Sequence, residues 1–175
     1  MIKKWKELSR ELVFEKYGRK VEKVIFKIQN GKESDFYIKN EGNVVCVLAL
    51  TSDKKVILAK QYRPGPKKIL TELPGGAIDK GEKPEESIKR ELLEETGYTG
   101  NFNFVTKTFS DGYSTRERYC FVATNCKKSQ EIKNSDEEFT ESVLISIEEF
   151  KKILRSGQIT DTETGFLGLD YLNLI

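Results

Sequence analysis

The segment from Gly76 to Tyr98 constrains the fold of this chain more than any other, because it specifies a turn, a helix and a row of acids in one stretch. It reads GAIDKGEKPEESIKRELLEETGY. Pro84 suits the first position of a helix, where its missing N–H would have no partner, and Gly97 suits the left-handed residue that ends one. The segment therefore predicts a helix over residues 84–96, entered from a glycine turn.

Three acids gather on one side of this predicted helix. Glu91, Glu94 and Glu95 stand at positions i, i+3 and i+4, which places their Cβ atoms within about 6 Å of one another, and each like-charge pair costs roughly 0.2–0.5 kcal/mol. Stability alone does not explain such a cluster, whereas Mg²⁺ prefers carboxylate oxygens. The alternative is an ordinary solvated face, but the glycine pair before the helix and Glu82 in the loop favour a metal site.

The full spacing of the segment resembles the signature of the Nudix hydrolases. It has Gly76, five residues, Glu82, seven residues, Arg90-Glu91-Leu92, one residue, Glu94-Glu95, one residue, Gly97. The resemblance implies an α+β fold, a Nudix-like α/β/α sandwich around a mixed β-sheet, and hydrolysis of a nucleoside diphosphate derivative at its pyrophosphate with Mg²⁺ or Mn²⁺. It also implies these roles: Glu91 and Glu95 as metal ligands, Glu94 as a further ligand or a water-activating group, Arg90 as the partner that orients the glutamates, and the Gly75 carbonyl as another ligand.

Residues before the helix resemble one branch of that family, the ADP-ribose pyrophosphatases and related nucleotide-sugar hydrolases. The matching stretches are Gln61-Tyr62-Arg63-Pro64-Gly65 and Glu72-Leu73-Pro74-Gly75-Gly76. The resemblance implies that Arg63 and Glu72 bind substrate, since a planar guanidinium suits phosphate oxygens. A surface arginine beside a turn is the alternative for Arg63. The branch also implies a general base in a late acidic loop, here Glu137 or Glu138, although a solvated loop would carry the same acids.

One stretch departs from the branch. Where the branch has Ser-Pro-Gly followed by a glutamate, this chain has Ser110-Asp111-Gly112 and places Arg116 near the register of that glutamate. Arg116 could bind a terminal phosphate of the substrate or form a charge pair with a neighbouring strand. The branch implies ADP-ribose as substrate, cleaved to AMP and ribose 5-phosphate, and the departure keeps GDP-mannose or another nucleotide sugar open.

Two further functions stay open at this point. The first is hydrolysis of nucleoside triphosphates or dinucleoside polyphosphates. Enzymes of that kind generally lack the stretch 61–65 and an N-terminal β appendage such as residues 1–43, so both features argue against it. The second is a non-catalytic, nucleotide-sensing Nudix domain. A domain without activity would be expected to lose acids of the signature, and this chain keeps them all.

The chain divides into an N-terminal β appendage, residues 1–43, and a Nudix domain, residues 44–175. A hairpin is expected in the appendage around Asn30-Gly31, with strands over 21–28 and 34–38, and the resemblance implies that the appendage forms a homodimer. Strands in the domain are expected over 44–50, 56–59, 69–73, 102–108, 118–123 and 142–147. Ser146 and Glu149 form a capping-box pattern that predicts a helix over 148–156, and a third helix is expected within 161–175.

Composition excludes several other classes. A net charge of +2 with 33% charged residues gives no basic excess for nucleic-acid binding. No apolar run approaches the roughly 20 residues of a membrane span, and the N-terminus lacks the apolar core of a signal peptide, so a cytoplasmic protein is expected. The absence of histidine excludes histidine-based triads and zincin sites. Three cysteines without a C-x-x-C motif argue against a disulfide framework or a zinc site, and Cys46 and Cys120, which lie in apolar runs, are expected to fill the core.

Overall fold

A computed structural model gives the structure of the chain and describes residues 1–132, 134 and 139–175. The chain forms two compact units, one of Met1–Asn43 with Phe109–Glu117 and one of Val44–Thr108 with Arg118–Ile175. The smaller unit consists mainly of the N-terminal strands, and the larger unit contains all three described helices.

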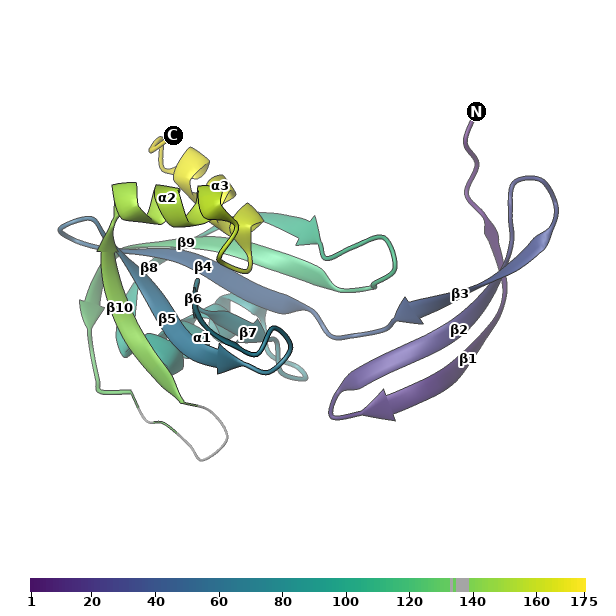
Figure 1. Cartoon of the computed structure of the whole chain (residues 1–175), viewed down its shortest axis with the longest axis horizontal. Coiled ribbons are helices and arrows are strands. Elements are labelled where there is room, and N and C mark those ends of the chain that lie inside the picture. The colour runs from purple at the N-terminus through teal and green to yellow at the C-terminus, as the bar shows by residue number, and fades with distance from the viewer. Residues whose placement is uncertain (133, 135–138) are drawn as a thin grey trace. The chain divides into compact units, whose positions relative to one another are not determined.

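The N-terminal unit is built on an antiparallel sheet of three strands (Figure 1). The predicted hairpin is confirmed as β2, Arg19–Lys27, and β3, Glu33–Lys39. A further strand was not predicted from the sequence: β1, Lys6–Lys16, pairs with β2 and is exposed along its whole length. Two register shifts interrupt the pairing of β1 with β2. Each shift breaks the alternation by which a strand is recognised, because an extra residue reverses the faces that follow it.

The larger unit is organised by a mixed sheet of seven strands. Its main path runs in the order β10-β5-β4-β9-β8, with β6 paired to β5 and β7 paired to β4. β4 and β9 are parallel, whereas β5 is antiparallel to β4, β6 and β10. The strands are β4 Val44–Thr51, β5 Lys55–Arg63, β6 Lys68–Glu72, β7 Gly75–Ala77, β8 Tyr98–Phe109, β9 Glu117–Lys128 and β10 Thr140–Ser146.

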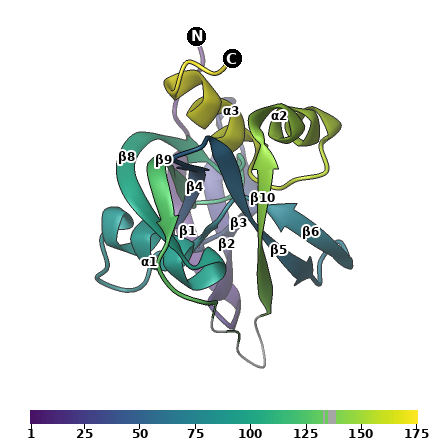
Figure 2. The same cartoon turned by 90° about the vertical axis from the view of Figure 1, so that its left-hand side faces the viewer.

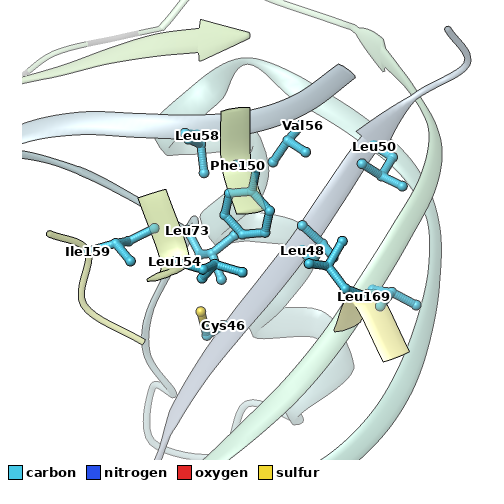
Figure 3. Packing of buried hydrophobic residues seen from close by; sticks show 11 residues of the cluster. Cys46, Leu48, Leu50, Val56, Leu58, Leu73, Phe150, Leu154, Ile159 and Leu169 are labelled. Carbon is cyan, nitrogen blue, oxygen red and sulfur yellow. The ribbon is translucent and has the colours of Figure 1, made fainter. Parts of the chain in front are cut away.

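Helices cover both faces of this sheet (Figure 2). On one face, α1 (Pro84–Thr96) buries Ile88 and Leu92 against apolar side chains of β4, β5 and β9. On the other face, α2 (Ile147–Ser156) and α3 (Thr162–Tyr171) contribute Phe150, Leu154 and Leu169 to a second cluster (Figure 3). The three cysteines are free and buried, in agreement with the core positions expected for Cys46 and Cys120. The predicted α/β/α sandwich is therefore confirmed.

The predicted helix boundaries are also confirmed. The α1 helix ends at Gly97, whose φ of 78° is left-handed and whose N–H bonds the Leu93 carbonyl. The Ser146 hydroxyl accepts a hydrogen bond from the Glu149 N–H, so the capping box starts α2 one residue earlier than expected. Asp161, before α3, is left-handed at φ 55°. Across the described residues, no helix combines the length and the apolar character that crossing a membrane requires.

The glycine turn predicted before α1 is wrong, because Gly75 and Gly76 lie in β7 and pair with Cys46 and Val45 of β4. Neither glycine has a positive φ. A Cβ on Gly75 would lie 2.8 Å from the Cys46 Cα and 3.0 Å from the Val45 carbonyl carbon. The pair of glycines is therefore explained by close packing rather than by a left-handed turn.

Candidate active site

Glu95 is the most deeply buried of the three acids on α1. Only 6% of the residue is exposed. Its Oε2 accepts a hydrogen bond from the Gly75 N–H at 2.9 Å, and its Oε1 accepts one from Gln61 Nε2 at 3.3 Å. Burial, against the opposing effects of the Gly75 N–H, Arg63 and Gln61 and with a contribution from the neighbouring Glu91, raises the pKa of Glu95 to about 8. Below that pH, the carboxyl is protonated unless a cation lies beside it.

Glu91 lies one helical turn before Glu95 and reaches the same strand. A Cβ on Gly76 would lie 2.5 Å from the Glu91 Cδ and 2.6 Å from its Oε2. The missing side chain of Gly76 therefore provides the space that the Glu91 carboxylate fills. Since Gly75 contacts Glu95 and Gly76 faces Glu91, β7 brings the backbone of both glycines against the acidic side of α1.

Arg90 bridges the acids of the helix and the loop before it. Its Nε and Nη2 each donate to one carboxylate oxygen of Glu82 at 3.0 Å, and its Nη1 donates to Glu91 at 2.8 Å and to Glu94 at 3.1 Å. The Arg90 guanidinium lowers the pKa of Glu82 to about 2. Glu94 is the outermost acid, with 58% of its side chain exposed. The exposure of the three acids therefore increases from Glu95, which is buried, through Glu91 to Glu94, which is exposed.

The donor set fits a hard divalent cation, which binds carboxylate and carbonyl oxygens. Glu91 and Glu95 of α1 face neighbouring residues of the strand β7. A positive charge beside Glu95 would offset the cost of burying its carboxylate, which raises its pKa. In the described part of the chain, no group of three or more acids, cysteines or histidines is arranged to hold an ion as it stands. Arg90 instead forms ion pairs with the Glu91 and Glu94 carboxylates, so a cation would compete with its guanidinium for them.

Arg63 and Glu72, predicted to bind substrate, contact each other directly. The Arg63 Nε donates to Glu72 Oε2 at 2.5 Å, and the Thr160 hydroxyl donates to Glu72 Oε1. The Glu72 side chain is only 2% exposed, whereas 40% of the Arg63 side chain is exposed. Of the two, Arg63 is the residue that can reach a ligand from solvent.

Arg116 belongs to the N-terminal unit, where it is paired within that unit. Its Nε donates to the Gly42 carbonyl at 2.9 Å, and its Nη2 lies 3.5 Å from Glu41. Asp111, which replaces the proline of the branch, accepts the Tyr113 N–H at 2.7 Å and pairs with Lys39 at 2.6 Å. Lys39 and the Tyr113 N–H lower the pKa of Asp111.

The two candidates for the general base, Glu137 and Glu138, lie outside the described residues. Asn134 and Thr140, on either side of them, are hydrogen-bonded to each other: the Thr140 N–H donates to Asn134 Oδ1 at 2.8 Å, and Asn134 Nδ2 donates to the Thr140 carbonyl at 3.2 Å.

Sequence reasoning missed two residues of this region, Gln61 and Thr160. Gln61 lies in a stretch that resembles the branch. The sequence does carry a signal for Gln61. It lies two residues before Arg63, and residues so spaced on a strand share a face. Thr160 lies 88 residues from its partner Glu72, and no local pattern links the two.

Known proteins share the sequence pattern and the fold of this chain. The NUDIX domain model matches residues 40–161. One relative is an ADP-ribose pyrophosphatase of Bacillus subtilis (strain 168); it is 32% identical, and the alignment covers 97% of this chain and 92% of the relative. Another is a methanol dehydrogenase activator of Bacillus methanolicus, which is 29% identical over the same shares of the two chains. A GDP-mannose pyrophosphatase of Cronobacter sakazakii (strain ATCC BAA-894) is 31% identical, with 78% of this chain and 76% of the relative covered.

A solved structure described as an ADP compounds hydrolase has the same fold. It superposes with a TM-score of 0.82 at 21% identity and covers 99% of this chain and 96% of its own. The family match spans well over half of the chain and includes the acidic helix, the strand β7 and the residues before them. The chain therefore belongs to the Nudix hydrolase family.

Proposed function

We propose that this Nudix hydrolase cleaves the pyrophosphate bond of ADP-ribose, giving AMP and ribose 5-phosphate, with Mg²⁺ or Mn²⁺. The observation that carries the proposal is the junction of β7 and α1, where Gly75 and Gly76 lie against Glu95 and Glu91. The relative from Bacillus subtilis, named an ADP-ribose pyrophosphatase, supports the choice of substrate.

Glu91 and Glu95 would hold the cation, together with the Gly75 carbonyl. A divalent ion bound there polarises a phosphoryl oxygen and lowers the pKa of a bound water. Glu94 is the outermost acid and bonds Arg90 at 3.1 Å, which suits a further ligand or a group that orients the attacking water. Arg90 holds Glu82, Glu91 and Glu94 in a common network. The general base is proposed to be Glu137 or Glu138.

Arg63 would bind a phosphate of the substrate. It follows Gln61 by two residues on β5, and residues so spaced share a face of a strand. Because Gln61 bonds Glu95, the Arg63 guanidinium extends from the same face as the acidic site. A guanidinium offers paired N–H donors that match phosphate oxygens.

GDP-mannose or another nucleotide sugar is the second candidate substrate. The stretch around Asp111 and Arg116 favours it, because this stretch differs from the pattern that accompanies ADP-ribose. Arg116 as a substrate contact belongs to this candidate; in the N-terminal unit it is paired to Glu41 and the Gly42 carbonyl.

The N-terminal unit is proposed to form a homodimer through β1. All eleven residues of this strand are exposed, and among them Leu8, Leu12, Val13 and Phe14 expose 41–51% of their surface. A long exposed edge strand with apolar side chains is a template for pairing with another chain. Light scattering after size exclusion tests this: a monomer mass at micromolar concentration would contradict it.

The substrate is tested by phosphate release coupled to alkaline phosphatase. The panel contains ADP-ribose, GDP-mannose, UDP-glucose, diadenosine polyphosphates and nucleoside triphosphates, each with Mg²⁺ and with EDTA. Metal-dependent turnover of ADP-ribose above the other compounds, with AMP and ribose 5-phosphate as products, is the expected result. Preference for GDP-mannose would select the second candidate. No turnover of any compound by folded protein would contradict both and favour a nucleotide-sensing domain.

A further inference from the structure

Arg63 is the outer end of a chain of polar contacts that runs into the larger unit. We call it the Arg63 network, and its members are Arg63, Glu72, Thr160, Asp161 and Arg118. Glu72 accepts from Arg63 Nε at 2.5 Å through one oxygen and from the Thr160 hydroxyl through the other. Both oxygens of this buried carboxylate are therefore bonded, one to β5 and one to the segment before α3.

The far end of the network fixes Thr160. The Thr160 hydroxyl lies 3.0 Å from Asp161 Oδ2, and Arg118 Nη2 lies 2.6 Å from Asp161 Oδ1. Asp161 has a left-handed backbone at φ 55°, which aspartate adopts more readily than most residues. Arg118 holds its carboxylate in an ion pair, so the Thr160 hydroxyl lies between two carboxylates that are each bonded elsewhere.

Stability does not account for this arrangement. Glu72 is a charged residue with 1% of its surface exposed, and removing an ion from water costs several kcal/mol that a partner only partly returns. An apolar residue at this position would avoid the cost. The buried acid instead orients Arg63 through Nε, and the remaining N–H groups of the guanidinium have no bond to any described residue.

We propose that Glu72 and Thr160 are positioning residues, which hold the Arg63 guanidinium so that its terminal N–H groups meet a phosphate group of the substrate. The inference rests on the proposed function. It also revises the role predicted for Glu72 from the sequence: Glu72 acts through Arg63 rather than by touching substrate. The ligand class is an anion with paired oxygens, as in a nucleoside diphosphate.

The test replaces the Thr160 hydroxyl, because Thr160 is exposed and valine keeps its shape. Binding of ADP-ribose is measured by calorimetry in EDTA, which prevents turnover, for Thr160→Val, Thr160→Ser and Arg63→Ala. Thr99→Val, at an exposed position in β8, is the matched control. Thr160→Val is expected to weaken binding by about tenfold, the range of one hydrogen bond to a charged group. Thr160→Ser and Thr99→Val should bind like the wild type.

A double-mutant cycle separates positioning from a general structural effect. If Thr160 acts through Arg63, Thr160→Val has no effect in the Arg63→Ala background, because the group that it positions is gone. Steady-state kinetics should agree, with a raised KM and a kcat within about twofold of the wild type. Equal loss of affinity in both backgrounds, or wild-type affinity in Thr160→Val, would overturn the inference.

The wild type distinguishes this inference from the proposed function. If it turns over ADP-ribose with metal and Arg63→Ala weakens the binding measured in EDTA, the proposed function stands and the cycle alone decides the role of Thr160. If the wild type binds neither ADP-ribose nor inorganic pyrophosphate, the proposed function fails, and the assignment of the network to phosphate binding fails with it.

Discussion

Replacing Gly76 with alanine should abolish most activity while leaving the fold intact. The new Cβ would lie 2.5 Å from the Glu91 Cδ, whereas an ordinary contact begins at 3.4 Å. The Glu91 carboxylate must therefore move by about 1 Å. Mg²⁺ requires ligands at about 2.0–2.1 Å in near-octahedral geometry, and a misplacement of about 1 Å can cost about 100-fold in rate. We expect a fall in kcat/KM of about that size.

The stability of the Gly76→Ala variant should change little. The displaced group is the far end of a flexible side chain, so the cost is that of another rotamer, about 0.5–1.5 kcal/mol. Gly75→Ala provides the contrast, because its Cβ would lie 2.8 Å from the Cys46 Cα and would push on backbone. Overpacking of that kind costs about 1–3 kcal/mol, which for a chain of this size is a fall in Tm of about 2–12 °C.

The assay combines thermal unfolding with turnover of ADP-ribose and with Mn²⁺ binding followed by electron paramagnetic resonance. Gly42→Ala is the control, since a Cβ there meets nothing within 4 Å. Gly76→Ala should bind Mn²⁺ more weakly and melt close to the wild type. Wild-type activity in Gly76→Ala would refute the assignment of Glu91 to the metal site. A loss of Tm as large as that of Gly75→Ala would refute the claim that the side chain absorbs the clash.

Three further predictions follow from the site and the core. Gln61→Leu removes a donor to Glu95 and should weaken Mn²⁺ binding several-fold with a normal Tm; unchanged affinity would contradict this. The pKa of Glu95 is about 8 in the folded state and 4.5 in the unfolded state, so the folded state binds the extra proton between these values. The free energy of unfolding of the metal-free wild type should therefore fall as the pH rises from 4.5 through 8, and that of metal-free Glu95→Gln should fall less. Equal falls in the two proteins would contradict the pKa shift. Phe150→Ala, at a fully buried position, should cost about 3–5 kcal/mol in a urea titration and keep activity at low temperature.

The sequence predicted the helices because their signals are local, and it predicted the sandwich through its resemblance to a known family. Pro84 and Gly97 bound α1, and Ser146 with Glu149 starts α2; each signal acts within a few residues of the element that it defines. The strand β1 escaped prediction because its two register shifts break the alternation of faces. Its turn, Tyr17-Gly18, has positive φ at both residues, 50° and 72°, as a two-residue hairpin requires.

The candidate site was predicted in part, for a related reason. Glu91, Glu94 and Glu95 are recognisable because one helix carries all three. The burial of Glu95 beneath Gln61 and the bond from Thr160 to Glu72 depend on which strands the fold places side by side. The glycines of β7 show the same limit: a glycine pair in a sequence suggests a turn, whereas only the neighbouring strand and helix reveal that a Cβ has no room.

The structure also changes the explanation of why one helix can carry three adjacent acids. The sequence suggested that a metal ion resolves their repulsion. In the structure, Arg90 donates to Glu91 and Glu94, and burial keeps Glu95 protonated below a pH of about 8. One guanidinium and one proton thus offset the like charges before any cation binds. The helix can therefore fold without metal, and a cation must compete with Arg90 for Glu91 and Glu94. If the proposed cation binds here, its competition with Arg90 separates the folding of the site from the binding of metal, and the cation would control the chemistry rather than the existence of the fold.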